Sequence, residues 1–568
     1  MTITARRQAQ RPARRPAPRL ATVLDIARVE ARLLVRSGLV LAGLVAGGVV
    51  IWLFIHPVEP LWWNVAWEIG EGQLVLAMAV LVAAQLAAGR ASRDGLADLY
   101  ASFPASAGTR ALGQLAGLAG AIPASLVLIG ASAGAVELIG AIGTPAITVL
   151  AGGLLLVIAA GAAGIAIGTR FAHPLAGVLG ALALFGISSQ SGRFSGAVIW
   201  LLPWEFHQDD LGFIPGPLTG YPPAGAHATE LAAFAVLAAI VALAVTVRAV
   251  RARAGLATAG IAAVALIGLA GAVQLRPIPT AALNHLVTES ANPASAQRCT
   301  TASQVRYCLY PGFGSLLPSW QAPVNGVLAH VPARPGHTLT VSQVGTTSLD
   351  STLTHGHPKR QVARWDAELG RAPAIVRPGS AIYLPVGSWP AFGGQLADAR
   401  FNLALAAADW ATGIPITSSN GPECVPFDQA REAIAIWLAI LAAHPRASEL
   451  QAGLPAHGIG AGPDIHGTIV PIWNFRGAVA GQVDPFGSIP LTTEAGYLLA
   501  HAMTSLPEQK VANVLKDGWS RWINVRTTDA QLAAALGIPM PKVPVPPTAL
   551  VRRLIANQGP NIEVCGSG

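Results

Sequence analysis

The stretch from Thr144 to Gly168, TPAITVLAGGLLLVIAAGAAGIAIG, contains no charged residue and consists almost entirely of Ala, Gly, Leu, Ile and Val. It is longer than the roughly 20 apolar residues that a helix needs to cross the hydrocarbon core of a bilayer. We expect this stretch to cross a membrane as a single helix.

Six further segments have the same apolar character. They are Gly38–His56, Gly72–Ala88, Ala111–Ala133, Ala172–Ser188, Glu230–Val247 and Leu256–Gln274. The whole chain is 52% hydrophobic and only 12% charged, with a mean hydropathy of +0.50, which is too apolar for a soluble chain of 568 residues. The sequence therefore predicts a membrane α-helical bundle of about seven transmembrane helices over residues 38–274. Ala172–Ser188 is the weakest of the seven, because it is short and carries Pro174 near its start.

Arginine side chains are distributed unevenly, and their distribution predicts an orientation. Nine arginines crowd the basic N-terminal segment 1–37. Others follow the second, fourth and sixth apolar segments: Arg90, Arg93, Arg110, Arg170, Arg248, Arg251 and Arg253. Because cytoplasmic loops are enriched in Lys and Arg, we expect a cytoplasmic N-terminus in a multi-pass protein of the cell membrane. This placement accounts for the net charge of +8, so we expect no nucleic acid as a partner.

An odd number of crossings puts the residues after the last segment, 275–568, on the extracytoplasmic side. The loops predicted to face that side contain Trp62, Trp63, Trp67, Trp200 and Trp204. We expect these side chains to lie at the membrane interface, where Trp is enriched.

Small residues recur four positions apart within the apolar segments. The pairs are Gly43 with Gly47, Gly113 with Gly117, Gly130 with Gly134, and Gly164 with Gly168. This spacing lets helix backbones approach closely where lipid provides no hydrophobic drive for association. Ion coupling has little support, because neither Glu137 nor His173 lies near the middle of a segment.

The chain contains no phosphate-binding loop of the Walker type. That motif ends in Gly-Lys-Ser/Thr, and none of the four lysines (Lys359, Lys510, Lys516 and Lys542) follows a glycine. If ATP powers a transport step, the nucleotide site must be on a separate chain. We expect no cofactor.

Two cytoplasmic stretches are candidates for docking such a chain. Ala27–Ser37 alternates charged and apolar residues at helical spacing, as an amphipathic helix on the inner membrane face would. Asp94–Arg110, between the second and third segments, predicts a short helix broken at Pro104, with Ser106 as the cap of the next helix.

These stretches resemble the membrane subunits of ABC-2-type exporters, in particular actinobacterial permease-like proteins with an extended outer domain. In that family a charged amphipathic helix precedes the first membrane helix. A loop of the form Gly-x-x-x-x-Leu-x-x-x-Pro-x-Ser lies between the second and third membrane helices and contacts the ATPase. The residues in matching positions, with the following arginine, are Gly95, Leu99 or Tyr100, Phe103, Pro104, Ser106 and Arg110. The resemblance implies a permease that works with a cytoplasmic ABC ATPase as a homodimer or heterodimer. A seventh helix departs from the six-helix core of the family and would anchor the outer domain.

Residues 275–568 predict a mainly α domain with some β structure. Apolar residues recur at helical spacing in Gln395–Thr412, Asp428–His444, Thr492–Ser505 and Glu508–Ile523. A short helix follows Thr528 and stops at Gly537, whereas His337–Val341 alternates as a strand does. Segments around Cys299–Pro311, Asp428–Ala439 and Trp519–Leu532 also resemble the outer domains of the permease-like family.

All four cysteines lie in this domain, which suits an oxidising compartment. We favour the pairings Cys299–Cys308, which would pin a hairpin-like loop, and Cys424–Cys565, among the three that four cysteines permit. A zinc site is the alternative, although no Cys-x-x-Cys pair is present.

The sequence predicts no enzyme activity for this chain by itself. It contains neither His-Glu-x-x-His nor Gly-x-Ser-x-Gly, while a catalytic triad assembled in space stays open. The leading hypothesis is the exporter permease. The alternatives are a membrane-anchored binding or sensor protein without transport activity and, third, an extracytoplasmic hydrolase.

Overall fold

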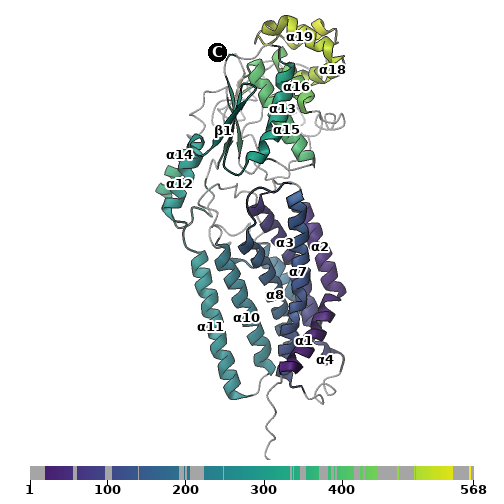
Figure 1. Ribbon diagram of the computed structural model, residues 1–568, viewed down its shortest axis with the longest axis vertical. Helices are drawn as coiled ribbons and strands as arrows, with labels where there is room; N and C mark the ends of the chain where they lie inside the picture. Colours follow the sequence, from purple (N-terminus) through teal and green to yellow (C-terminus); the bar gives the residue numbers. More distant parts are fainter. Residues whose placement is uncertain are drawn as a thin grey trace, which may run out of the picture.

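The computed structural model describes two bodies, a helical bundle and a tail domain, arranged end to end (Figure 1). The described residues are 20–55, 61–95, 105–138, 140–190, 198, 201–204, 223–246, 249–332, 336, 338–345, 349, 353–369, 381–385, 389, 393–414, 423–425, 429–443, 470–471, 491–492, 494–540 and 562–564. The described part of the chain is mostly helical, with a small mixed sheet.

The bundle contains a helix at each of the seven predicted segments. In chain order its elements are α1 (Leu20–Val35), α2 (Gly38–Ile55), α3 (Trp62–Ala88), α4 (Arg90–Arg93), α6 (Ala107–Gly117), the 3-10 turn η1 (Leu118–Gly120), α7 (Ala121–Leu138), α8 (Ile147–Arg170), α9 (Leu175–Ser188), α10 (Ala224–Thr246) and α11 (Val250–Gln274).

The predicted number of seven membrane-crossing helices is not confirmed. Within the described residues, five helical stretches are long and apolar enough to cross a membrane: Val65–Ala88, Ala107–Leu138, Ile147–Arg170, Ala224–Thr246 and Val250–Gln274. A sixth candidate combines α1 and α2, which meet at an angle of 52°. The segment predicted at Ala172–Ser188 forms α9, whose 14 residues extend only about 21 Å at 1.5 Å per residue. This is shorter than a hydrocarbon core of about 30 Å.

The helix α3 lies at the centre of the bundle and is covered by α2, α7, α8 and α9. Three of the four predicted small-residue pairs lie at close helix contacts. A Cβ atom added to Gly164 of α8 would lie 2.2 Å from the carbonyl oxygen of Leu81 on α3. A Cβ atom added to Gly168 would lie 2.4 Å from the carbonyl oxygen of Gln85, also on α3. Gly43 and Gly47 similarly bring α2 against α3, and Gly113 and Gly117 bring α6 against α1. The prediction is wrong for Gly130 and Gly134 of α7, which face open space.

Three of the tryptophans predicted to lie at the membrane interface are buried inside the bundle instead. Trp62, Trp67 and Trp204 are at most 4% exposed. The ring of Trp204 packs against that of Trp67 at a centroid distance of 5.2 Å and occupies the space where Gly70 lacks a side chain. Trp62 donates a hydrogen bond of 3.0 Å to Glu137 on α7. These rings therefore stabilise helix packing at the end of the bundle nearest the tail domain.

The tail domain is built around a four-stranded sheet of order β1-β2-β3-β4. Its strands are β1 (Arg298–Ala302), β2 (Val305–Leu309), β3 (Leu339–Val344) and β4 (Ala381–Pro385). Strands β1 and β2 form an antiparallel hairpin, whereas β2, β3 and β4 run parallel. Parallel neighbours need crossover connections, and α13 (Leu317–His330) and α14 (Lys359–Leu369) provide the two crossovers.

The helix α16 (Ala430–Ala443) forms the centre of the tail domain, and every residue from Ala430 to Ile440 is buried. It packs against α13, α15 (Gly393–Thr412), α18 (Glu494–Thr504) and α20 (Asp529–Leu536). The other described elements are α12 (Thr280–Ala291), η5 (Pro293–Ser295), η6 (Gly314–Leu316), β5 (Glu423–Val425), β6 (Val470–Pro471), β7 (Leu491–Thr492), α19 (Glu508–Trp522) and β8 (Ile562–Val564). Helices α13, α15 and α16 lie on one side of the sheet, and α12 and α14 lie on the other (Figure 1).

Most helices predicted in the second half of the tail domain are confirmed. They appear as α15, α16, α18, α19 and α20, and the strand predicted at His337–Val341 appears as β3. Thr528 caps α20 in a capping box with Gln531, and Gly537 ends the helix with φ +70°. Helices α12, α13 and α14 were not predicted. Helix α13 buries Trp320, Pro323, Val324, Val327 and Leu328 at helical spacing, but Pro323 within it is a residue that normally interrupts a helix. Only Trp365 and Leu369 of α14 are buried, so α14 shows no broad apolar stripe.

The predicted Cys299–Cys308 disulfide is present. The two cysteines lie directly opposite each other in the β1–β2 hairpin. The second pairing stays a prediction, because Cys565 lies outside the described residues. Strands β5 and β8 pair in parallel with Cys424 opposite Glu563, which brings the two chain segments of that predicted bond together.

A buried acid and a buried base lie near each other between α15 and α16. Asp409 and Arg431 are each 4% exposed. The Arg431 guanidinium donates hydrogen bonds to the Gln429 side chain at 2.7 Å and to the Gly413 carbonyl oxygen at 2.8 Å. Burial raises the pKa of Asp409 well above its ordinary value, and the nearby Arg431 charge opposes this shift.

The contact of α3 with α8 predicts opposite effects for two glycine substitutions. Gly164→Ala forces the new methyl group against the Leu81 carbonyl oxygen, and we expect a cost of about 1–3 kcal/mol from overpacking. Gly130→Ala meets no neighbour and gains up to about 1 kcal/mol of helix propensity. Thermal unfolding of the detergent-solubilised protein, followed by tryptophan fluorescence, measures both changes. Equal unfolding temperatures for the two variants would contradict the packing described here.

Asp409→Asn should make the unfolding temperature less dependent on pH. The pKa of Asp409 is higher in the folded state than in the unfolded state, where it is about 3.9. Protonation of Asp409 therefore stabilises the fold fully below the unfolded-state pKa. This stabilisation is lost as the pH rises through the folded-state pKa. Asparagine does not titrate, so the unfolding temperature of the variant relative to the native protein should rise between about pH 4 and pH 8. The exposed Asp517→Asn is the control. A difference that stays constant over this range would refute the assignment.

Candidate functional site

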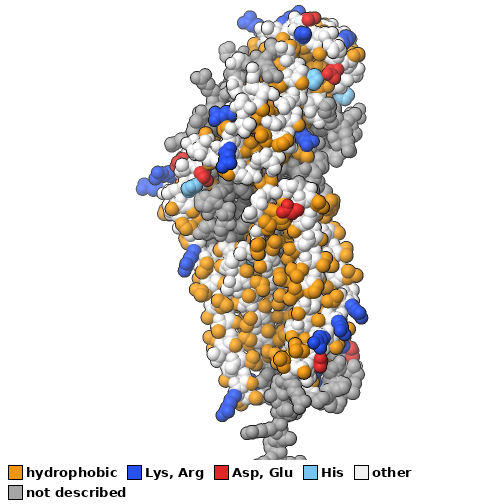
Figure 2. Space-filling view, in the orientation of Figure 1, with side chains coloured by type: hydrophobic (Ala, Val, Ile, Leu, Met, Phe, Trp, Pro, Cys, Tyr) orange, Lys and Arg blue, Asp and Glu red, His pale blue; other side chains and the backbone are white. Residues whose placement is uncertain are grey.

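The end of the bundle farthest from the tail domain contains Gly95, Ser106 and Arg110, the described members of the predicted ATPase-coupling loop. Helix α1, the short helix α4 and the start of α6 lie together there (Figure 1). The arginines on α1 and at the neighbouring helix ends are Arg28, Arg32, Arg36, Arg90, Arg93, Arg110, Arg170, Arg251 and Arg253. The acids on the same described segments are Asp25, Glu30 and Asp94. Figure 2 shows apolar side chains covering the bundle and basic side chains near this lower end. The region is therefore strongly positive.

The predicted amphipathic helix exists as α1 and is held against α6 by small residues. The side chain of Ile26 fills the space beside Gly113, Glu30 lies over Gly117, and the backbone of Ala31 lies over Gly120. Leu33 and Val35 remain exposed. Helix α1 is thus fixed to the bundle on one face and presents leucine and valine side chains on the other.

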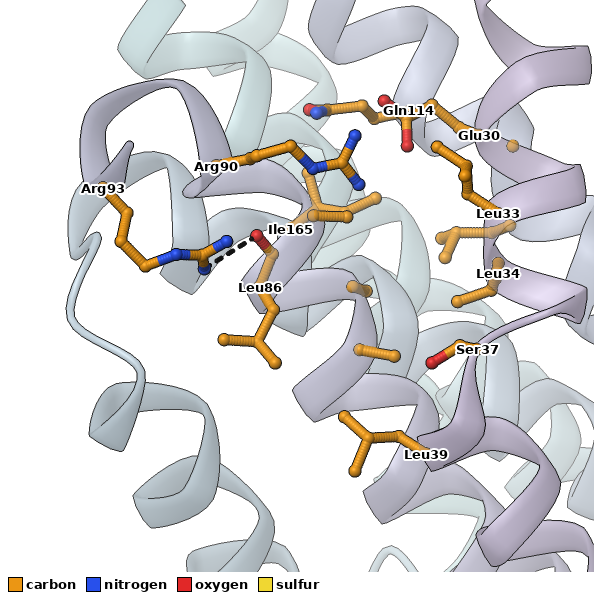
Figure 3. Close-up of a pocket in the computed structure, with 15 residues that line it drawn as sticks. Glu30, Leu33, Leu34, Ser37, Leu39, Leu86, Arg90, Arg93, Gln114 and Ile165 are labelled. Carbon is orange, nitrogen blue, oxygen red and sulfur yellow. Dashed lines mark hydrogen bonds between the residues drawn. The ribbon is translucent and has the colours of Figure 1, made fainter. Parts of the chain in front are cut away.

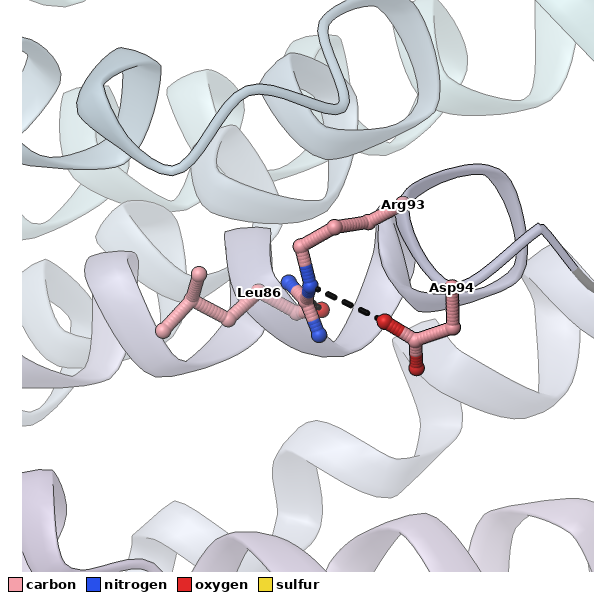
Figure 4. Close-up of polar contacts among 3 residues, drawn as sticks. All are labelled: Leu86, Arg93 and Asp94. Carbon is pink, nitrogen blue, oxygen red and sulfur yellow. Dashed lines mark hydrogen bonds and ion pairs between the residues drawn. The ribbon is translucent and has the colours of Figure 1, made fainter.

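Polar contacts fix the beginning of the connection between α3 and α6. The guanidinium of Arg93 donates a hydrogen bond of 3.2 Å to the Leu86 carbonyl oxygen and forms an ion pair of 3.2 Å with Asp94 (Figure 4). The carbonyl groups in the last turn of a helix lack intrahelical partners, so Arg93 satisfies one of them. Gly95 follows with φ +68°, a left-handed conformation that glycine adopts without strain.

The end of this connection is fixed by the predicted cap. Ser106 Oγ accepts a hydrogen bond of 3.1 Å from the Thr109 backbone N–H, which confirms Ser106 as the N-cap of α6. The Arg110 guanidinium donates a bond of 2.8 Å to the Ala105 carbonyl oxygen. The structure brings Gly95, Ser106 and Arg110 to one end of the bundle. The other selected residues, Leu99, Tyr100, Phe103 and Pro104, lie outside the described residues.

A pocket of about 190 Å³ opens between α1 and the end of α3. Its polar lining consists of Glu30, Ser37, Arg90, Arg93 and Gln114. Its apolar lining is contributed by Leu33, Leu34, Leu39, Ala83, Ala84, Leu86, Ala87, Leu118 and Ile165, with Gly117 completing the wall. Figure 3 shows the Arg90 side chain extending from α4 toward Glu30 and Gln114, with the leucines on the side of Ser37. Glu30, Arg90 and Gln114 thus lie together at one end of the pocket.

Buried polar residues inside the bundle were missed by the sequence analysis. Gln73 and Ser125 exchange hydrogen bonds between α3 and α7. Gln85 donates to the carbonyl oxygens of Phe171 and His173 at 3.1 Å each, and Gln274 donates to Glu230 between α11 and α10. The sequence feature that could have identified them is a single polar residue within an otherwise apolar helix. Their hydrogen bonds cross-link helices, which gives them a structural role.

The described residues contain no group of three or more His, Cys, Asp or Glu side chains arranged to hold a metal ion. The lower end of the bundle presents guanidinium groups, helix ends and exposed apolar side chains, which suit the binding of a partner. No protein-family model, curated protein or solved structure matches the chain.

Replacement of the cap should loosen the start of α6. Ser106→Ala removes the acceptor for the Thr109 N–H, a change that typically costs about 1 kcal/mol. We expect faster hydrogen exchange at the first amides of α6, measured by mass spectrometry. Ser106→Asp retains an acceptor and serves as the matched control. Native exchange rates in Ser106→Ala would contradict the capping role.

Proposed function

We propose that this chain is an integral membrane, permease-like subunit of an ABC-type exporter. It would lack a nucleotide site and pair with a separate cytoplasmic ATPase, which docks at the end of the bundle formed by α1, α4 and the start of α6. Two copies, or this chain and a related one, would form the transport pathway. The 275–568 domain would lie on the extracytoplasmic side.

The observation that carries this proposal is the position of the α3–α6 connection. At its described ends, Arg93 lines the same pocket as Leu33 of α1, and Ser106 caps the helix α6 that packs against α1. The tail domain lies at the opposite end of the bundle (Figure 1). A separate ATPase could contact α1 and the connection at once, and movement of α1 would reach α6 through Gly113 and Gly117. Packed side chains and rigid helices of this kind can carry coupling between two sites.

Charge and cysteine chemistry support the orientation. The arginine-rich end suits the cytoplasmic side, where basic residues are enriched. The Cys299–Cys308 disulfide lies in the tail domain, and such bonds persist in oxidising compartments outside the cytoplasm. Both observations favour the same orientation and arise from different parts of the chain.

The test is purification of the full-length chain from its native host in mild detergent, followed by mass spectrometry of coeluting proteins. We expect an ABC ATPase in near-stoichiometric amount. Phe103→Ala, in the predicted coupling loop, and Arg110→Ala, which removes the bond to the Ala105 carbonyl oxygen, should each reduce the recovered ATPase severalfold. Arg251→Ala, at the same positive end on α11, should not.

Equal loss of ATPase in all three variants would indicate general charge attraction and would contradict docking at the connection. A chain that purifies without any ATPase would refute the exporter proposal. That result would favour the alternative, a membrane-anchored extracytoplasmic binding or sensor protein without transport activity.

A further inference from the structure

The pocket between α1 and α3 has two ends of different chemistry. Helix α3 runs toward the positive end of the bundle, so Arg90 and Arg93 lie beyond Ala83 and Ala84 along its direction. Arg90 is seven positions after Ala83, which corresponds to about 10 Å of helical rise. The pocket therefore changes from guanidinium groups at the end of the bundle to methyl and isobutyl groups about 10 Å nearer its middle.

The apolar part of the pocket opens to the outside of the bundle. Leu33 of α1 and Leu39 of α2 line the pocket and are 44% and 40% exposed. Along the face of α2 that carries Leu39, at positions 3, 7, 10 and 14 residues further on, the side chains of Ala42, Ala46, Val49 and Leu53 are also exposed. The pocket mouth is thus continuous with a surface that suits lipid chains.

The polar part can still bind an anion. The Arg93 guanidinium has five N–H donors, of which the contacts to Asp94 and Leu86 employ two. Arg90 extends toward Glu30 and Gln114 within the same pocket (Figure 3). The surrounding helix ends contain many more arginines than acids, so a further negative charge is favoured at this position.

We propose that this pocket binds an anionic phospholipid, with the phosphate of its headgroup at Arg90 and Arg93 and one acyl chain passing between Leu33 and Leu39 into the bilayer. The order of polar and apolar groups along the pocket matches the order along such a lipid. Basic pockets between membrane helices bind anionic headgroups in this way. The lipid would fill the gap between α1 and α3 and hold α1 in position. This inference does not depend on an ATPase partner.

The experiment is native mass spectrometry of the full-length protein after incubation with phosphatidylglycerol or with phosphatidylcholine. We expect retained phosphatidylglycerol and little phosphatidylcholine. Arg93→Gln, which alters a side chain about one third exposed, should lower phosphatidylglycerol retention about fivefold, since a basic residue near anionic lipid contributes about 1 kcal/mol. Arg90→Gln should act likewise. The matched control is Arg251→Gln with Arg253→Gln, which removes two arginines of α11 outside the pocket.

Several results would overturn the proposal. One is equal retention of the two lipids, and another is equal loss in the pocket variants and the α11 control. A third concerns the source of the phosphate: if inorganic phosphate raises the unfolding temperature as much as phosphatidylglycerol does, the site binds a free anion. Because Arg90 faces Glu30, folding of each variant is checked by its gel-filtration profile and unfolding temperature. Native profiles with unchanged lipid retention in Arg93→Gln would also refute the site.

Discussion

The close contact between α3 and α8 is the constraint on which the bundle depends. Gly164 and Gly168 place the α8 backbone against the carbonyl oxygens of Leu81 and Gln85. Lipid and leucine are equally apolar, so apolar helices associate mainly through close packing and hydrogen bonds. The glycines supply the packing, and Gln85 adds hydrogen bonds to the residues that follow α8. With α3 enclosed in this way, its C-terminal end is a fixed support for α4 and the connection to α6.

Close packing at glycines also holds α1 against α6 at the positive end of the bundle. Gly113, Gly117 and Gly120 face α1 in succession. Helix α1 is therefore fixed to the bundle on one face, and on another face the pocket separates it from the end of α3. The proposed ATPase docking and the proposed lipid site both follow from this arrangement. Both involve α1 and α4: the ATPase would contact the connection between α3 and α6, and the lipid would occupy the gap beside Leu33 and Leu39 with its headgroup at Arg90 and Arg93.

The tail domain rests on a different physical basis. It packs an apolar helix, α16, against four neighbours and builds a small sheet from two parallel crossovers and one hairpin. Burial of apolar surface from water supplies its stability, and the Cys299–Cys308 bond closes the edge hairpin. Leu61 and Ile142, from the bundle loops beneath it, join the same hydrophobic cluster. The two bodies thus meet through apolar contacts.

The sequence by itself determined the apolar helices, the amphipathic α1, the caps at Ser106 and Thr528 and the hairpin disulfide. Each depends on local composition or on residues a few positions apart. Tertiary structure alone decided that Gly164 is a contact and Gly130 is not, because both have the same spacing and only the position of a neighbouring helix distinguishes them. It likewise decided that Trp67 and Trp204 are buried, and that Glu30 and Arg90 line one pocket. Such pairs lie far apart in the chain, and their proximity is fixed by helix packing that no local pattern encodes.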